Sequence, residues 1–216
     1  MEIKQFPKIT VILRGYTYEQ VRCVVKNLVG TRLNAVEITT NSPDVFTTIR
    51  KISEEFGKDV YVGAGTVLNM EHAKAAVEAG STFLLSPIML DQEILDFCKE
   101  KGVISVPAAF SPSEVWKMAQ GGADIVKIFP AGRVGSQYFA DVQAPLGKLP
   151  LMAVGGVNGE NVQEYLDKGA SFAGIASGIF KKEDILNQNE EGIRESIRQF
   201  EERVQWERRV YGRNQI

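Results

Sequence analysis

Short runs of β-favouring apolar residues alternate along the chain with segments whose apolar residues recur at helical spacing. The first run spans residues 8–14, and after it Val21, Val24, Val25 and Leu28 stand three or four positions apart, as on one face of a helix. The same alternation repeats to the end of the chain. We therefore predict eight strands, at 8–14, 35–39, 60–63, 83–86, 103–106, 123–131, 151–154 and 172–176.

Residues that commonly begin helices stand shortly after these strands. Thr17, Asn69 and Ser111 are each followed by helical spacing, and Ser111 is followed by Pro112, a favourable first-turn residue. Ser42-Pro43 has the same form, so we predict that Ser42 caps the next helix. Four further helices are predicted at about 91–101, 136–142, 159–168 and 188–208.

Eight strand–helix units at a period of roughly 20–25 residues predict a (β/α)8 barrel, a TIM barrel, with the whole chain 1–216 as one domain. The helix at about 188–208 closes the chain. An open, doubly wound α/β sheet is the alternative. No G-x-G-x-x-G motif follows the first strand, which counts against that alternative.

The barrel makes a prediction about side chains, because alternate residues of a strand point to opposite faces. In the second strand Val36 and Ile38 share one face, and Glu37 lies on the other. Sending the aliphatic pairs outward beneath the helices turns Glu37, Lys127 and Arg14 inward. All three stand near the C-terminal ends of their strands, where barrel enzymes place their chemistry.

The composition of the chain restricts which classes of function it can have. The chain is 44% apolar and 24% charged with a net charge of −2, which gives no electrostatic basis for binding nucleic acid or an anionic membrane. The first nine residues lack a signal-peptide core, and Cys23 and Cys98 stand apart, as buried thiols of a reducing compartment would, so we expect a cytoplasmic protein. The single histidine, His72, excludes a histidine-rich metal site.

Lys127 is the most informative residue of the pattern. An apolar surrounding disfavours an ammonium ion, so its pKa should fall, and a neutral amine can form a Schiff base with a ketone. Glu37 would move protons, while Arg14 would bind an anionic group or lower the pKa of Lys127. The alternative is an Arg–Glu–Lys salt-bridge cluster that only holds the barrel together.

Glycine turns after two of the predicted strands indicate a phosphate-binding site. Gly155-Gly156 follows the seventh strand and Ser177-Gly178 the eighth, where such barrels often bind phosphate through backbone N–H groups. Thr66, after the third strand, either caps its loop or binds a substrate carboxylate. Phe129 is expected to pack against the substrate and Lys127.

The chain resembles the class I 2-keto-3-deoxy-6-phosphogluconate / 4-hydroxy-2-oxoglutarate aldolase family, and within it the 2-dehydro-3-deoxy-6-phosphogalactonate aldolase branch. The resemblance covers about residues 8–180. Its matching segments are Ile12-Leu13-Arg14-Gly15, Val36-Glu37-Ile38, Asn41-Ser42-Pro43, Gly63-Ala64-Gly65-Thr66-Val67-Leu68, Ser86-Pro87, Val126-Lys127-Ile128-Phe129-Pro130-Ala131, Ala153-Val154-Gly155-Gly156-Val157 and Ala176-Ser177-Gly178.

The resemblance implies an aldolase that releases pyruvate and glyceraldehyde 3-phosphate, forms a homotrimer and uses no metal or organic cofactor. It implies that Lys127 is the Schiff-base lysine and Glu37 the proton shuttle. Further residues are implied to line the pyruvate end or hold the phosphate: Arg14, Thr66 and Pro87 for the first, and Gly155, Gly156 and Ser177 for the second.

The chain departs from the family pattern in places. Asn41 stands where the phosphogluconate enzymes usually carry arginine, as in the galactonate branch, so Arg14 takes more of the carboxylate-binding role. Phe110 places a large apolar group beside the expected substrate path. Three other functions stay open: an aldolase giving pyruvate and glyoxylate from 4-hydroxy-2-oxoglutarate, a phosphosugar isomerase or epimerase, and a non-catalytic sugar-phosphate-binding barrel.

Overall fold

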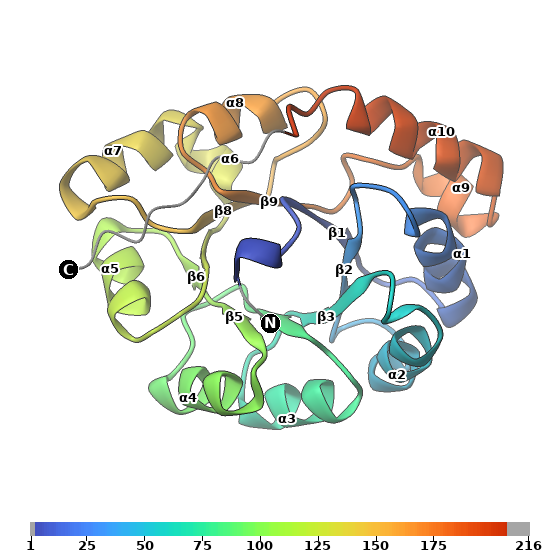
Figure 1. Ribbon diagram of the computed structural model, residues 1–216, viewed down its shortest axis with the longest axis horizontal. Helices are drawn as coiled ribbons and strands as arrows, with labels where there is room; N and C mark the ends of the chain where they lie inside the picture. Colours follow the sequence, from blue (N-terminus) through green and yellow to red (C-terminus); the bar gives the residue numbers. More distant parts are fainter. Residues whose placement is uncertain (1–2, 207–216) are drawn as a thin grey trace.

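Nine parallel strands form a nearly closed barrel in the computed structural model, which describes residues 3–206 (Figure 1). The strand order is β5-β4-β3-β2-β1-β9-β8-β7-β6. The strands are β1 Ile9–Leu13, β2 Ala35–Thr39, β3 Tyr61–Gly65, β4 Phe83–Leu85, β5 Ile104–Val106, β6 Ala108–Ala109, β7 Val126–Ile128, β8 Leu151–Val154 and β9 Phe172–Ile175. The predicted barrel is confirmed, with each strand at its expected place.

The ninth strand arises because the predicted fifth strand is divided at Pro107. Proline has no N–H group to donate to a neighbouring strand, so the ladder is interrupted there. The carbonyl of Pro107 still accepts a hydrogen bond from the N–H of Lys127 at 2.8 Å, and the N–H of Ile125 reaches the carbonyl of Ser105 at 3.1 Å. β5 and β6 therefore fill one strand position and close the ring against β7.

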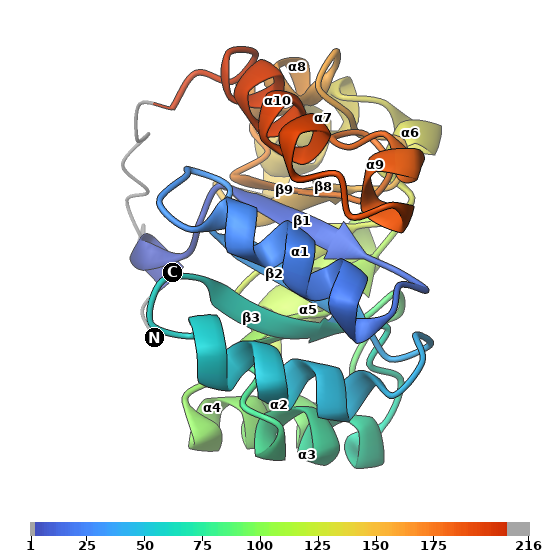
Figure 2. The same ribbon diagram turned by 90° about the vertical axis from the view of Figure 1, so that its right-hand side faces the viewer.

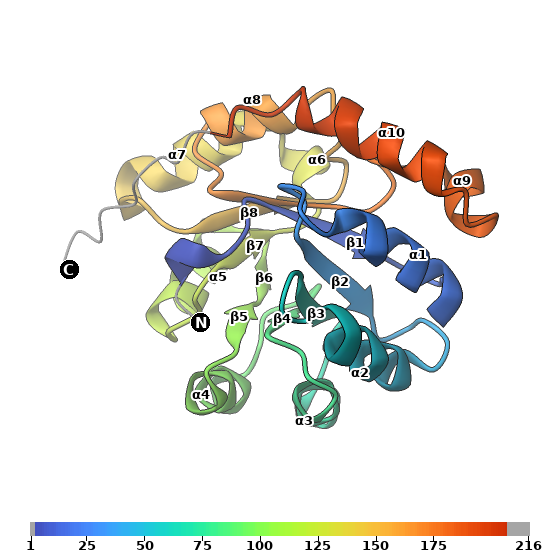
Figure 3. The same cartoon turned by 45° about the vertical axis from the view of Figure 1, so that its right-hand side comes forward.

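Helices surround the ring of strands, one layer outside it (Figure 3). They are the α-helices α1 Tyr18–Leu28, α2 Val45–Phe56, α3 Met70–Glu78, α4 Gln92–Lys101, α5 Pro112–Gln120, α6 Ala131–Val134, α7 Gln137–Leu146, α8 Val162–Asp167, α9 Lys182–Leu186 and α10 Glu190–Glu201. The 3-10 helix η1 Ile3–Gln5 is not part of this layer and lies over the middle of the ring in Figure 1. Among residues 3–206, no helix combines the length and the apolar character that crossing a membrane requires. The tail helix predicted at 188–208 is shorter, and residues 207 and 208 lie outside the described part.

Three of the predicted helix caps are confirmed. Thr17 and Ser111 each form a capping box, with Gln20 and Glu114 as the reciprocal partners, and Asn69 caps α3. The prediction that Ser42 caps α2 is wrong, because α2 begins after Asp44, which has a left-handed backbone with φ 45°.

Ser42 makes a different contact. Its hydroxyl accepts the N–H of Gly15 at 2.8 Å and shares a hydrogen bond of 3.1 Å with the hydroxyl of Thr39. It therefore joins the ends of β1 and β2 rather than beginning a helix.

Two separate sets of apolar side chains fill the two faces of the barrel wall. Val36 and Ile38 belong to the larger set, which packs between strands and helices, whereas Ala35 and Ile125 belong to a smaller set inside the ring. This division confirms the predicted alternation, and it places Glu37 and Lys127 on the inward face.

One end of the barrel interior is closed by aromatic rings. Phe6, just after η1, lies edge-on to Phe83 and Phe172, with ring centroids 5.0 and 5.7 Å away. η1 sits at the end opposite the arrowhead of β1 (Figure 2). Because all strands are parallel, every strand's C-terminal end lies at the other, unplugged end.

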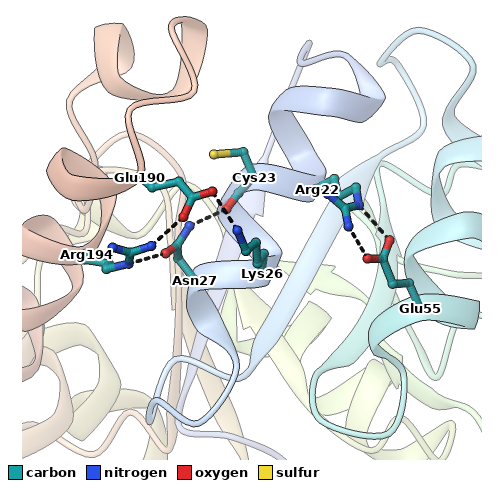
Figure 4. Close-up of polar contacts among 7 residues, drawn as sticks. All are labelled: Arg22, Cys23, Lys26, Asn27, Glu55, Glu190 and Arg194. Atoms are coloured by element: carbon teal, nitrogen blue, oxygen red, sulfur yellow. Dashed lines mark hydrogen bonds and ion pairs between the residues drawn. The ribbon is translucent and has the colours of Figure 1, made fainter.

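Polar contacts hold the last helix against the first. The carboxylate of Glu190 pairs with Lys26 at 2.8 Å and with Arg194, whose Nε donates to Asn27 at 2.8 Å (Figure 4). Beneath them Ile197 of α10 is buried in the outer apolar set. Buried apolar contacts supply most of the stabilisation of such a helix, since exposed ion pairs contribute little.

Candidate active site

The predicted site residues all lie at the C-terminal ends of the barrel strands. Lys127 is inside β7 and Glu37 inside β2, and the other residues stand within a few positions after their strands. These are Arg14 after β1, Asn41 after β2, Thr66 after β3, Pro87 after β4, Phe129 after β7, Gly155 and Gly156 after β8 and Ser177 after β9. A parallel barrel therefore brings them to one rim.

Lys127 is almost completely buried, with 4% of its surface exposed. Its Nζ lies 5.0 Å from the centroid of the Phe129 ring, as in a cation–π contact. Burial lowers the pKa of the ammonium to about 8; Glu37 opposes this effect and the positive charge of Arg14 adds to it. A pKa of about 8 leaves about a tenth of the amine neutral at pH 7, far more than in an ordinary lysine, and nucleophilic attack on a ketone requires this neutral form.

Glu37 is buried to 2% exposure on the same inward face. Its Oε2 has no hydrogen-bond partner within the protein. Burial raises the pKa of this carboxyl, and the nearby charges of Lys127 and Arg14 offset part of the rise. A carboxyl of this kind exchanges protons readily and has a free oxygen for a substrate or water.

The two groups do not form a salt bridge. In the described part of the chain, no ion pair within 4.0 Å joins Lys127, Glu37 or Arg14. The salt-bridge cluster considered from the sequence is therefore wrong. Since Arg14 affects the pKa values of both buried groups, its exposed guanidinium lies near enough to attract an anionic substrate to them.

The turn after β3 has an unusual backbone. Thr66 has φ 57°, in the left-handed region that β-branched residues rarely adopt. Gly65, just before it, makes room for Glu37, because a Cβ there would lie 1.5 Å from the Oε1 of Glu37 and would force that side chain to move. The glycine thus leaves the space that the carboxylate occupies. Asn41 is exposed and Pro87 half-buried nearby on the rim.

The turn after β8 has two consecutive glycines with positive φ, 88° at Gly155 and 79° at Gly156. Gly132 at the start of α6 packs against them, and its N–H donates to the carbonyl of Gly155 at 2.7 Å. Ser177, after the adjacent strand β9, is exposed. This corner offers small residues and backbone N–H groups, which suits an anion.

Sequence reasoning missed two glycines, Gly65 and Gly132, as functional residues. In the sequence Gly65 is only one member of a segment that matches the family, and its role follows from the inward direction of Glu37, which strand alternation predicts. Gly132 packs against a turn from another strand, which no local pattern reveals. In the described residues, no cluster of three or more His, Cys, Asp or Glu side chains could hold a metal ion.

Comparison with known proteins shows the family of the chain. A family model described as KDPG and KHG aldolase matches residues 2–196. A probable 2-dehydro-3-deoxy-6-phosphogalactonate aldolase of Rhizobium meliloti is 33% identical over 171 residues, covering 79% of this chain and 80% of the relative. The 2-dehydro-3-deoxy-6-phosphogalactonate aldolase of Escherichia coli is 29% identical over 195 residues, or 90% and 95% of the two chains.

Among solved structures, one described as native KDPGal superposes with a TM-score of 0.80 at 27% identity, covering 94% of this chain and 98% of the other. The resemblance found in the sequence, including its galactonate branch, is thereby confirmed. The match over most of the chain, by sequence and by fold, shows that the protein belongs to the KDPG and KHG aldolase family.

Proposed function

We propose that the protein is a class I aldolase that cleaves a 2-keto-3-deoxy-6-phospho sugar acid to pyruvate and glyceraldehyde 3-phosphate. Membership of an aldolase family makes it a carbon–carbon lyase. The observation that carries the mechanism is the buried Lys127, whose pKa is lowered to about 8 beside a buried carboxyl with a free oxygen.

In the proposed reaction the neutral amine of Lys127 attacks the C2 ketone. The resulting carbinolamine loses water and becomes an iminium ion, which accepts electrons. Glu37 supplies the proton that the departing hydroxyl needs and, as the carboxylate, then takes the proton from the C4 hydroxyl. General acid–base help of this kind contributes about 10²–10⁴-fold.

The C3–C4 bond then breaks, and its electron pair moves into the iminium to give an enamine. The aldehyde, glyceraldehyde 3-phosphate, leaves. Protonation of the enamine at C3 restores an iminium, and its hydrolysis releases pyruvate and frees Lys127. The apolar surroundings exclude bulk water from these intermediates, which favours their ordered conversion.

The remaining rim residues bind the two ends of the substrate. Arg14 and Asn41 take the carboxylate, with Thr66 and Pro87 beside them, because these residues follow β1, β2, β3 and β4, four consecutive strands of the barrel that include the strand of Glu37. Backbone N–H groups at the turn of Gly155 and Gly156, with the hydroxyl of Ser177, bind the phosphate. The ring of Phe129, in contact with the Lys127 amine, packs against the carbon chain.

Trapping with pyruvate and borohydride tests the proposal. Reduction of the iminium should leave a stable mass adduct on the peptide that contains Lys127, and Lys127→Met should abolish it. Glu37→Gln should still be trapped while its turnover falls by about 10²–10⁴-fold. An unmodified Lys127 peptide in the wild-type protein would rule out the proposed mechanism.

The substrate is tested by pyruvate release from three compounds. The galactonate and gluconate forms of the phosphorylated substrate differ at C4, and 4-hydroxy-2-oxoglutarate lacks the phosphate. A phosphate site at Gly155 and Gly156 predicts a higher kcat/KM for the phosphorylated compounds. Equal values for all three would argue against that site, and no release from any of them would favour a non-catalytic binder.

We also propose that the protein acts in the cytoplasm as a homotrimer. The large apolar side chains of Leu68, Ile88 and Phe110 are exposed at 45%, 51% and 47% on neighbouring loops of the rim, and a subunit contact would cover them. Sedimentation of the full chain should then give three times the monomer mass of 23.9 kDa.

A further inference from the structure

The strained conformation of Thr66 needs a physical cause. A threonine with φ 57° is in an unfavourable backbone conformation, and the surrounding structure must offset its energetic cost. Thr66 follows Gly65. The N–H of the next residue, Val67, donates a hydrogen bond to the carbonyl of Leu85 at 3.1 Å. The turn is therefore fixed on the β4 side, and its other side lies toward β2.

Thr40, the residue after β2, holds that other side with two hydrogen bonds. Its N–H donates to the carbonyl of Gly65 at 2.8 Å. Its hydroxyl donates to the carbonyl of Thr66 at 2.7 Å. The backbone bond can be made by any residue except proline, whereas the second bond needs a hydroxyl at position 40. The side chain of Thr40 thus acts directly on the strained residue.

We propose that Thr40 is a positioning residue that keeps Thr66 in its left-handed conformation and so aims it at the pyruvate end of the substrate. The inference rests on the proposed function, in which Thr66 lines that end. With the Thr66 carbonyl bound by the residue after β2, the orientation of the remaining groups of Thr66 is fixed. Thr40 itself acts through Thr66, without contact with the reacting atoms.

The side chain at position 40 can be altered without changing its volume. Thr40→Val keeps the shape and removes the hydroxyl, and Thr40→Ser keeps the hydroxyl. Thr47→Val, on the exposed side of α2, is the matched control. The readout is the pyruvate concentration that gives half-maximal rate of inactivation by borohydride, because it reports on the pyruvate end without the aldehyde.

Loss of one hydrogen bond of ordinary strength should raise that concentration about 3- to 10-fold in Thr40→Val. The rate at saturating pyruvate should stay within about twofold, and Thr40→Ser and the control should behave like the wild type. In a Thr66→Gly background, where glycine adopts positive φ without strain, the effect of Thr40→Val should largely disappear.

The outcomes separate this inference from the proposed function. If the wild-type protein is not trapped at all, the proposed function fails. If it is trapped and Thr40→Val has the same half-saturating pyruvate concentration, the role of Thr40 is refuted. A loss of saturating rate and melting temperature in Thr40→Val, with unchanged half-saturation, would also refute it, since that would show a merely structural contact.

Discussion

Burial of the Lys127 amine should cost the protein stability, and replacing this lysine should recover part of the cost. The pKa of the buried ammonium is lowered from 10.5 to about 8. At 1.36 kcal/mol per pKa unit, this corresponds to roughly 3 kcal/mol against folding with a protonated lysine. Lys127→Met removes the charge and keeps an unbranched apolar side chain, so its free energy of unfolding at pH 7 should rise.

The gain in stability should be smaller than this upper figure, because the variant also loses the favourable interaction between Glu37 and the positive charge of Lys127. Its pKa, already raised by burial, would rise further in the variant. We therefore expect a net increase of about 1–3 kcal/mol. For a chain of this size each kcal/mol shifts the melting temperature by about 2–4 °C.

The pH dependence identifies the cause. Below about pH 8, Lys127 is protonated in both the folded and the unfolded protein, so the advantage of the variant is constant. Between pH 8 and 10.5 the folded lysine loses its proton while the unfolded one keeps it. The wild type therefore gains stability with rising pH, and the difference between the two proteins shrinks.

Urea unfolding of both proteins between pH 7 and 10.5 measures this difference. Lys148→Met is the matched control, because Lys148 is exposed and its replacement should have little effect. The reasoning fails if Lys127→Met is less stable than the wild type at pH 7. It also fails if the advantage stays the same from pH 8 to 10.5.

Two further substitutions test the site and the fold. Gly65→Ala should displace the Glu37 carboxylate, because the new methyl group would lie 1.5 Å from Oε1. Turnover should then fall by about 10²-fold or more, while pyruvate trapping on Lys127 persists. Unchanged turnover would contradict the steric argument. Ile197→Ala should lower the free energy of unfolding, measured in urea, by about 2–5 kcal/mol, because this side chain of α10 is 3% exposed. The kcat at 25 °C should not change. A loss of stability smaller than about 1 kcal/mol would show that the surrounding side chains collapse into the cavity.

Much of the fold could be predicted because the barrel repeats one simple pattern. Alternation of period two placed Glu37 and Lys127 inward and Val36 and Ile38 outward, and the two apolar sets confirm this division. The parallel arrangement then brought all the strand ends to one rim. These features depend only on local periodicity and topology, which the sequence contains.

Other features depend on contacts between distant segments. Ser42 has the local form of a helix cap, but its hydroxyl instead binds the N–H of Gly15, 27 positions earlier. The fifth strand is divided at Pro107 because proline has no N–H to donate, and the effect of that absence depends on which strand lies beside it in the fold. The hydrogen bond from the Thr40 hydroxyl to the strained Thr66 joins the ends of two strands, so no local pattern reveals it.

The relation between Lys127 and Glu37 is the feature that sequence periodicity alone could not decide. An inward lysine and glutamate are equally compatible with a salt bridge, which would raise the pKa of the amine and lower that of the carboxyl. The structure has the opposite directions for both groups, because burial outweighs their attraction. Proximity without pairing keeps the pKa of the amine at about 8, so part of Lys127 is neutral and can attack a ketone at the first step of aldol cleavage. The stability that a salt bridge or an apolar pair would supply is thus forgone at the residues proposed to carry the chemistry.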